Sequence, residues 1–355
     1  MKLNSVQYLR ATAILLVVAF HASGHLGDVR PTFDFLKYGQ YGVDLFFVIS
    51  GFIMAVTTTS TSSASSFAAR RLWRIVPLYW LVTLAYVAIL LVAPDLVTSA
   101  ALNFGHVLKS FLFIPSYNPT FPDLIWPLVI PGWSLNYELY FYAIFAISLF
   151  VSARDRHWIA SLILLLLVVL GQIISTKNPV IITYTNILLL EFVFGIIVGA
   201  VFLNERASHT RALSLIFCLV AVASIVCMSL GITVWRSVLY GSISATILSF
   251  LISFEQSGVI FSNVALIGIG DASYSIYLTH PAIIGSLRRI GDAIHFKSVG
   301  APLELGALLV ALVGSSLFGW LIFTKIERPI MGWRNKFLRR NPAGFVEDVK
   351  RAELT

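Results

Sequence analysis

HWIASLILLLLVVLGQIIS, residues 157–175, is an apolar run of 19 residues that contains no Asp, Glu, Lys or Arg. A helix of this length rises about 28 Å, close to the thickness of the hydrocarbon core of a bilayer. The run is unbroken rather than alternating, so it is typical of a membrane-spanning helix and not of a strand in a membrane β-barrel. Similar runs recur along the chain and decide its fold class.

The composition of the whole chain agrees with a membrane protein. Of 355 residues, 58% are hydrophobic and 12% are charged, and the mean hydropathy is +0.86. Soluble domains carry about 25% charged residues, so this chain has too few charges to cover a water-facing surface. Disorder is excluded as well, because disordered chains are poor in hydrophobic residues. The sequence predicts an all-α, polytopic transmembrane helical bundle.

About ten segments are long and apolar enough to span a bilayer. They are residues 6–25, 39–58, 75–93, 132–151, 157–175, 181–203, 212–230, 232–253, 265–287 and 303–324. The connection 94–131 holds six prolines and a short apolar stretch at 102–114. We expect an irregular or re-entrant outer loop there, with a short interfacial helix.

The distribution of Lys and Arg predicts the orientation of the bundle. With ten spans, the connections on the side of the two termini hold 16 of these cations and the opposite side holds eight. The positive-inside rule therefore places both termini in the cytoplasm. This bias explains the net charge of +8, and no nucleic-acid partner is expected. Residues 1–330 form the predicted membrane domain, and residues 331–355 form a basic cytoplasmic tail.

Ionisable residues within the spans are costly in lipid and are therefore candidates for function. Arg10 and His21 are eleven residues apart, which is three helical turns plus about 20°, so they share one face of the first span. His21 is expected in the outer third of the membrane, and Asp44, Glu138 and His280 are expected at a similar depth on three other spans. Alone, His21 would most simply be an interhelical hydrogen-bonding group. Because all four residues are expected at one depth, a shared functional site is favoured.

A second group of charges lies toward the cytoplasm. Arg70, Arg71 and Arg74 precede the third span, near the level of Arg10. Arginine suits phosphate because its planar guanidinium binds two oxygens at once. Alone, these residues would be anchors for lipid headgroups. Together with the outer group they predict a basic inner mouth and a histidine–carboxylate pocket on the outer side.

This arrangement predicts a transfer reaction across the membrane. A histidine oriented by a carboxylate, either Asp44 or Glu138, is a general base that can deprotonate a hydroxyl group. Arginines at the inner mouth could hold the phosphates of a cytosolic acyl-coenzyme A while its long arm reaches outward. A covalent acyl-His21 intermediate is an alternative. No metal and no permanently bound cofactor are expected.

Six short motifs, in order, resemble the acyltransferase-3 family of integral membrane acyltransferases. They are Ser5–Ala11 with the Arg10–His21 spacing, Gly42–Phe52, Arg71–Trp80, Trp133–Leu135 with Glu138, Tyr274–His280 and Glu327–Pro329. The resemblance covers residues 3–329, and its opening is most similar to members that serve exopolysaccharide synthesis.

The resemblance implies transfer of an acyl group, most often acetyl, from acyl-coenzyme A to extracytoplasmic carbohydrate. It implies that His21 is catalytic, that Glu138 acts near it or near the acceptor, and that Arg10, Arg71 and Arg74 serve donor binding or pocket structure. The predicted site therefore comprises His21, Glu138 and Asp44 as catalytic residues, Arg10, Arg71 and Arg74 as donor-binding residues, and Trp133, Ser134, Tyr274, Tyr277 and His280 as pocket residues. The expected partners are acetyl-CoA or another acyl-CoA, a polysaccharide or lipid-linked oligosaccharide, membrane lipids and polysaccharide synthesis machinery, at the bacterial cytoplasmic (inner) membrane.

Two other classes of protein fit parts of this pattern. A transporter or flippase for an acylated or lipid-linked sugar would also carry ionisable residues in its spans, as a proton relay. Its site would be expected near the midplane, however, whereas the polar residues here divide between two faces. A structural subunit of a polysaccharide synthesis complex would tolerate loss of His21.

Overall fold

The computed structural model describes residues 3–25, 34–59, 61–97, 100–203, 206–259, 262–293 and 301–339. Those residues form helices and connections and include no strand, so the predicted all-α bundle is confirmed. The helices are α1 (Asn4–His25), η1 (Asp34–Tyr41), α2 (Gly42–Thr57), α3 (Ala64–Val92), η2 (Pro94–Leu96), α4 (Phe104–Phe111), α5 (Gly132–Val151), α6 (Arg156–Ile173), α7 (Pro179–Tyr184), α8 (Leu189–Phe202), α9 (Ala207–Ser229), α10 (Arg236–Gln256), α11 (Val264–Asp271), α12 (Ser273–Ala293), α13 (Ala301–Ile322), η4 (Phe323–Glu327) and α14 (Arg328–Arg339).

Nine helical segments among the described residues are long and apolar enough to cross a membrane. They correspond to nine of the ten predicted spans. The predicted span 265–287 is instead divided at Ala272 into α11 and α12. Gly270 allows α11 to lie directly on α1, because a β-carbon there would be 2.3 Å from the Gln7 carbonyl oxygen. The 21 residues of α12 still suffice to span a bilayer by length.

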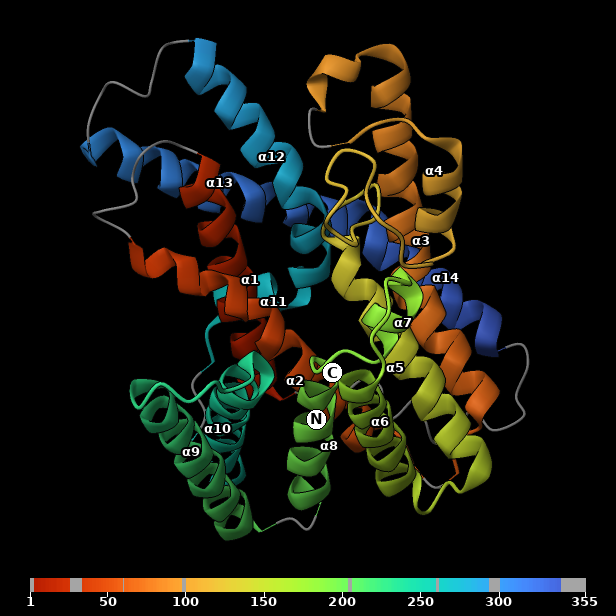
Figure 1. The fold of residues 1–355 in the computed structure, drawn as a ribbon, viewed down its shortest axis with the longest axis vertical. Helices are drawn as coiled ribbons and strands as arrows, with labels where there is room; N and C mark the ends of the chain where they lie inside the picture. Colours follow the sequence, from red (N-terminus) through yellow and green to blue (C-terminus); the bar gives the residue numbers. More distant parts are fainter. Residues whose placement is uncertain are drawn as a thin grey trace.

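The long helices are grouped around α1 and α2, which contact each other (Figure 1). Helix α1 packs against η1, α11, α12 and α13, whereas α2 packs against α8 and α10. Helices α9 and α10 lie side by side, and α3 contacts α4, α5 and α14. This arrangement puts the two helices that carry Arg10, His21 and Asp44 at the centre of the fold. The basic tail predicted at 331–355 is helical up to Arg339, and residues 340–355 lie outside the described part of the chain.

Helix α1 begins against the cytoplasmic end predicted for α10. The backbone N–H groups of Asn4 and Ser5 donate to the two carboxylate oxygens of Glu255, at 2.9 and 3.0 Å. The Ser5 hydroxyl also donates to the Leu251 carbonyl, at 3.2 Å. The first N–H groups of a helix have no partner within that helix, and a carboxylate there also interacts favourably with the helix dipole. Glu255 therefore fixes the position of the helix that carries Arg10 and His21.

Two glycines allow α2 and α8 to pack closely. A β-carbon at Gly51 would lie 2.2 Å from the Phe192 carbonyl oxygen, and one at Gly195 would lie 2.0 Å from the Val48 carbonyl oxygen. Small residues permit such close approach of helices in membranes, where packing replaces the hydrophobic effect.

Gly195→Ala is expected to force α2 and α8 apart and to destabilise the fold by about 1–3 kcal/mol, the usual cost of overpacking. Gly268→Ala is the matched control, because nothing lies within 4 Å of a β-carbon at that helical position. Alanine favours a helix over glycine, so the control is expected to be neutral or slightly stabilising. Thermal unfolding of the purified proteins in detergent measures both. Equal unfolding temperatures for the two variants would contradict the prediction.

The proline-rich connection contains the expected short helix, α4. His106 on α4 is 5% exposed, and its Nδ1 lies 3.2 Å from the Ser116 hydroxyl oxygen. Ser110 donates to the His106 carbonyl at 2.8 Å and accepts from the Leu128 N–H at 2.9 Å. Leu128 and Val129 are fully buried. The end of this connection is therefore buried within the bundle, and its re-entry into the membrane stays a prediction.

This connection is expected to loosen at acidic pH. Burial, together with the charge of Lys109, lowers the pKa of His106 below its usual 6.5. The folded connection therefore resists protonation while the unfolded chain takes up a proton, so its stability is complete above about pH 7.5 and falls as pH drops below 6.5. Hydrogen exchange of residues 112–131, corrected for intrinsic rates, is expected to be faster at pH 5.5 than at pH 7.5. His106→Gln cannot titrate and should show no such difference. A pH dependence unchanged in this variant would assign the effect to another group.

Candidate active site

A cavity that is partly open to its surroundings lies between α1, α2, α3, α5 and α12. Seven of the eleven predicted site residues line it, and they are Arg10, Arg71, Arg74, Ser134, Glu138, Tyr274 and Tyr277. Segments as far apart in sequence as α1 and α12 therefore contribute to one site. The other four predicted residues, His21, Asp44, Trp133 and His280, do not line this cavity.

Arg10 is held in place by the first residue of α12. It is 5% exposed, and its Nε and Nη2 atoms donate to the Ser273 hydroxyl at 3.2 and 3.0 Å. Its Nη1 donates to the Gln7 side chain at 3.4 Å. A serine hydroxyl cannot neutralise a guanidinium. The positive charge of Arg10 is therefore oriented at the cavity without being cancelled by its hydrogen-bond partners.

Arg71 and Arg74 reach the same cavity from α3. Arg71 donates to the Thr57 hydroxyl at 3.1 Å, and its guanidinium lies 5.8 Å from the centre of the Tyr142 ring. Aromatic faces attract cations and hold them in a defined orientation. Together with Arg10, these side chains bring three guanidinium groups to a cavity that contains one carboxylate, Glu138. The cavity therefore suits an anion, as expected of the inner group.

Glu138 lines the cavity together with the three arginines. Its carboxylate accepts a close hydrogen bond from the Tyr142 hydroxyl and a longer one, 3.5 Å, from Ser50. Glu138 is six residues, about 9 Å, beyond the start of α5, whereas Asp44 is only about 3 Å beyond the start of α2. Helix α5 also begins inside the bundle, because the preceding loop is buried. The structure therefore groups Glu138 with the arginines, and its outer-third depth in the membrane stays a prediction.

Two of the residues predicted for the outer pocket form a pair of histidines. The rings of His21 on α1 and His280 on α12 are 5.1 Å apart between centroids. His280 is fully buried, and its Nδ1 donates to the Tyr277 carbonyl at 2.7 Å. A neutral imidazole with a protonated Nδ1 leaves Nε2 as an acceptor, and that atom makes no hydrogen bond to any described residue. The structure thus brings together two of the four residues predicted for the outer pocket.

Tyr277 connects the histidine pair to the cavity. Its hydroxyl group lies 2.9 Å from the Ser134 hydroxyl within the cavity lining, and its ring centroid is 5.9 Å from that of His280. Trp133 lies in an aromatic cluster behind the lining, 6.4 Å from Phe47 between ring centroids. Trp133 therefore supports the cavity wall rather than facing the cavity.

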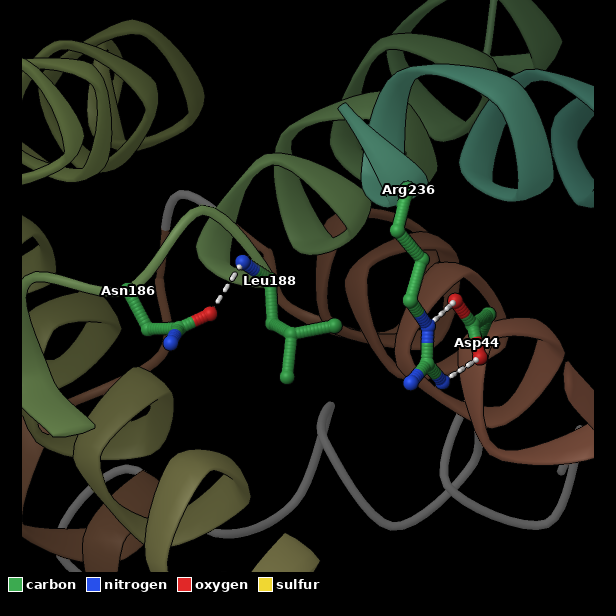
Figure 2. Close-up of polar contacts among 4 residues, drawn as sticks. All are labelled: Asp44, Asn186, Leu188 and Arg236. Atoms are coloured by element: carbon green, nitrogen blue, oxygen red, sulfur yellow. Dashed lines mark hydrogen bonds and ion pairs between the residues drawn. The ribbon is translucent and has the colours of Figure 1, made fainter. Parts of the chain in front are cut away.

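Asp44 has a partner that the sequence did not indicate. Both of its oxygens accept from Arg236, at 3.2 Å from Nε and 2.6 Å from Nη2, and Asp44 is fully buried (Figure 2). In the same view, Asn186 accepts from the Leu188 N–H at 3.0 Å, just before α8 begins. The ion pair joins the start of α2 to the start of α10. Arg236 is a loop cation by sequence, and only folding brings it to a residue 192 positions earlier.

The structure adds further residues to the site. Ser273 binds Arg10, Tyr142 and Ser50 bind Glu138, and all three line the cavity. Glu327, which ends the single π-helical turn η4, accepts from the Ser275 hydroxyl at 2.5 Å and is 4% exposed. Glu327 stands in one of the six motifs, but serine and tyrosine are too common in spans to be selected by sequence. Among the described residues, no group of three or more His, Cys, Asp or Glu side chains is placed to hold a metal ion.

Comparisons with known proteins identify the family of the chain. The family model described as "Acyltransferase domain" matches residues 3–324. The chain is 36% identical over 330 residues to the exopolysaccharide production protein ExoZ of Rhizobium meliloti (strain 1021), covering 92% of this chain and 98% of ExoZ. It is 25% identical to the acyltransferase MdmB of Streptomyces mycarofaciens, covering 98% and 95% of the two chains. It is also 25% identical to the peptidoglycan O-acetyltransferase OatA of Listeria monocytogenes, covering 79% of this chain and 49% of OatA.

No solved structure matches the chain. The family match nevertheless includes every helix that contributes to the cavity and to the histidine pair. The chain therefore belongs to the acyltransferase-3 family and is a multi-pass membrane O-acyltransferase.

Proposed function

We propose that this enzyme transfers an acetyl group from cytosolic acetyl-CoA, or another acyl group from its CoA thioester, to a polysaccharide hydroxyl. The acceptor is an extracytoplasmic or lipid-linked polysaccharide, and the enzyme works in the bacterial inner membrane beside the polysaccharide synthesis machinery. The names of its relatives support this acceptor class, because ExoZ is an exopolysaccharide production protein and OatA a peptidoglycan O-acetyltransferase.

One observation carries the proposal. A cavity with three guanidinium groups and one carboxylate is joined by Tyr277 to the histidine pair. Arg10 and His21 are eleven residues apart on one helix, about 16 Å along its axis. A long donor with anionic phosphates at one end and a reactive thioester at the other fits the distance between the arginines of the cavity and His21.

The arginines would bind the donor phosphates. Arg71 and Arg74 come from the start of α3, at the predicted cytoplasmic side, and Arg10 lies across the cavity on α1. Charge-assisted hydrogen bonds from guanidinium to phosphate are shorter and stronger than neutral ones. Glu138, held by Tyr142 and Ser50, would limit the positive charge and keep the arginines apart.

His21 would act as the general base for the acceptor. It takes the proton of a sugar hydroxyl while that oxygen attacks the thioester carbonyl; the carbon–sulfur bond then breaks, and the CoA thiolate leaves with the proton. His280 is the titratable side chain placed against the His21 ring, and it can help to keep that ring in position. Asp44 would act indirectly, since Arg236 occupies both of its oxygens.

Labelled acetyl transfer tests the proposed function. Membranes that contain the enzyme would receive radiolabelled acetyl-CoA, and label would be followed into extracted polysaccharide and its lipid-linked precursor. We expect label in the carbohydrate, removable by mild base as an ester, and none in membranes without the enzyme. Activity that requires a proton gradient and leaves no ester on the carbohydrate would instead indicate transport of a sugar.

A further inference from the structure

A cluster of aromatic and charged side chains lies outside the cavity, where η1 meets the start of α10. The Tyr41 and Tyr240 rings stack with centroids 3.3 Å apart, and the Tyr38 ring lies 6.3 Å from that of Tyr41. The guanidinium of Arg236 lies 4.9 Å from the centre of the Tyr41 ring. We call these four residues, Tyr38, Tyr41, Arg236 and Tyr240, the tyrosine platform.

The platform is partly open to its surroundings. Tyr38 is 53% exposed, and the side chain of Arg236 is 40% exposed although its carboxylate partner is fully buried. Lys37 is also exposed, with its ammonium group 5.3 Å from the centre of the Tyr38 ring. Charged groups do not remain exposed to hydrocarbon. The platform therefore faces water or the polar headgroup layer, and the predicted orientation puts it on the outer side.

Asp44 holds the Arg236 guanidinium in place and neutralises its charge, so that Arg236 can act as a fixed hydrogen-bond donor. Two of its nitrogens donate to Asp44, which cancels its charge (Figure 2). Its Nη1 makes no hydrogen bond to any described residue. Glu191 is fully buried beside the pair and interacts electrostatically with both Asp44 and Arg236. A paired guanidinium with a spare N–H suits a neutral hydroxyl better than an anion, which would meet the carboxylate behind it.

The platform is close to the proposed base. Gly39 of η1 lies against α1, because a β-carbon there would be 2.3 Å from the Leu16 carbonyl oxygen and 3.1 Å from the Phe20 β-carbon. The Phe20 ring in turn lies 4.9 Å from the His21 ring. The segment that carries Tyr38 and Tyr41 is thus packed against the helical turns just before His21. A chain molecule lying on the platform could extend to the histidine pair.

We infer that the tyrosine platform is an acceptor subsite that binds a neutral sugar ring of the polysaccharide, which rests on the proposed function. An exposed phenol ring offers an apolar face with a polar edge, which suits the C–H face and hydroxyl groups of a pyranose. The Arg236 Nη1 donates to a sugar hydroxyl. This contact holds the repeating unit while another of its sugars reaches His21. Interfacial tyrosines that only anchor a protein to headgroups need no fixed guanidinium beside them.

Direct binding tests the subsite separately from catalysis. The probe is a repeating-unit oligosaccharide from the source strain with its esters removed by mild base, added without any acyl donor to the purified protein in detergent. Saturation-transfer NMR and titration would compare wild type with Tyr38→Ala, Tyr38→Phe and Arg236→Lys. Phe104→Ala is the matched control, because Phe104 is an aromatic residue of the α4 connection that is 84% exposed.

Tyr38→Ala is expected to weaken oligosaccharide binding about 3- to 10-fold, which corresponds to the free energy of one aromatic contact. The NMR saturation transfer from the protein to the sugar ring protons should disappear in this variant. Phe104→Ala should bind as wild type does, and Tyr38→Phe, which keeps the ring face but loses the hydroxyl group, should bind more tightly than Tyr38→Ala. Arg236→Lys should bind more weakly than wild type because it loses the planar fork. If Tyr38→Ala and Arg236→Lys both bound the oligosaccharide with wild-type affinity, the proposed subsite would be wrong. The acetyl transfer assay would still test the proposed function. No binding by wild type would overturn the subsite as well. Failure of acetyl transfer from acetyl-CoA with oligosaccharide binding intact would count only against the proposed reaction.

Discussion

Replacing His21 by alanine is expected to abolish acetyl transfer to carbohydrate while the protein still folds. A positioned general base contributes about 10²- to 10⁴-fold to a rate, so the label in polysaccharide should fall by at least about two orders of magnitude. His21 lies at the outer part of α1, with its ring against the ring of His280. It does not line the arginine cavity, so its loss should leave donor binding intact. Labelled transfer at equal protein levels gives the rate, and binding of a CoA analogue gives the donor affinity.

A second histidine supplies the control for this experiment. His209 on α9 is exposed, and His209→Ala should transfer acetyl at the wild-type rate. His280→Ala should lower the rate less than His21→Ala, because His280 positions the base rather than contacting the acceptor. If His21→Ala retained more than about a tenth of the wild-type rate, the base would have to be another group.

The fold could be predicted from local sequence because each apolar run must satisfy its backbone within a helix. Nine runs became the helical segments that fit a membrane by length and composition. The run at 265–287 was divided at Ala272, and Gly270, just before this break, packs on the α1 backbone, which is a contact between residues far apart in sequence. Hydropathy along one segment carries no information about such a contact.

The candidate site could be predicted in part. The grouping of Arg10 with Arg71 and Arg74 followed from their depth along their helices, and the structure places all three at one cavity. The position of Glu138 beside the arginines was not predicted, because it depends on how α5 packs against α2 and α3, which are distant in sequence. Arg236 was assigned to a connection, since nothing local shows that it binds Asp44.

Removing the guanidinium of Arg10 is expected to have the second largest effect on activity. In Arg10→Ala the KM for acetyl-CoA should rise about 10- to 100-fold, the range for losing a hydrogen bond to a charged group, while kcat changes less. The reason is that Arg10 is oriented toward the cavity by Ser273 and Gln7, neither of which cancels its charge. An incoming phosphate would therefore meet a guanidinium that needs no rearrangement. Initial rates over a range of acetyl-CoA concentrations measure both constants.

Two further variants separate charge from geometry at Arg10. Arg10→Lys keeps the charge but offers one ammonium group in place of the fork that binds Ser273, so its KM should lie between those of wild type and Arg10→Ala. Ser273→Ala keeps the charge and frees the fork, so it should raise KM only a few-fold. If all three variants lowered kcat and left the KM for acetyl-CoA unchanged, Arg10 would act on the reacting groups instead. The arginine cavity would then have to bind the acceptor, and the cytosolic entry of the donor would have to lie elsewhere in the bundle.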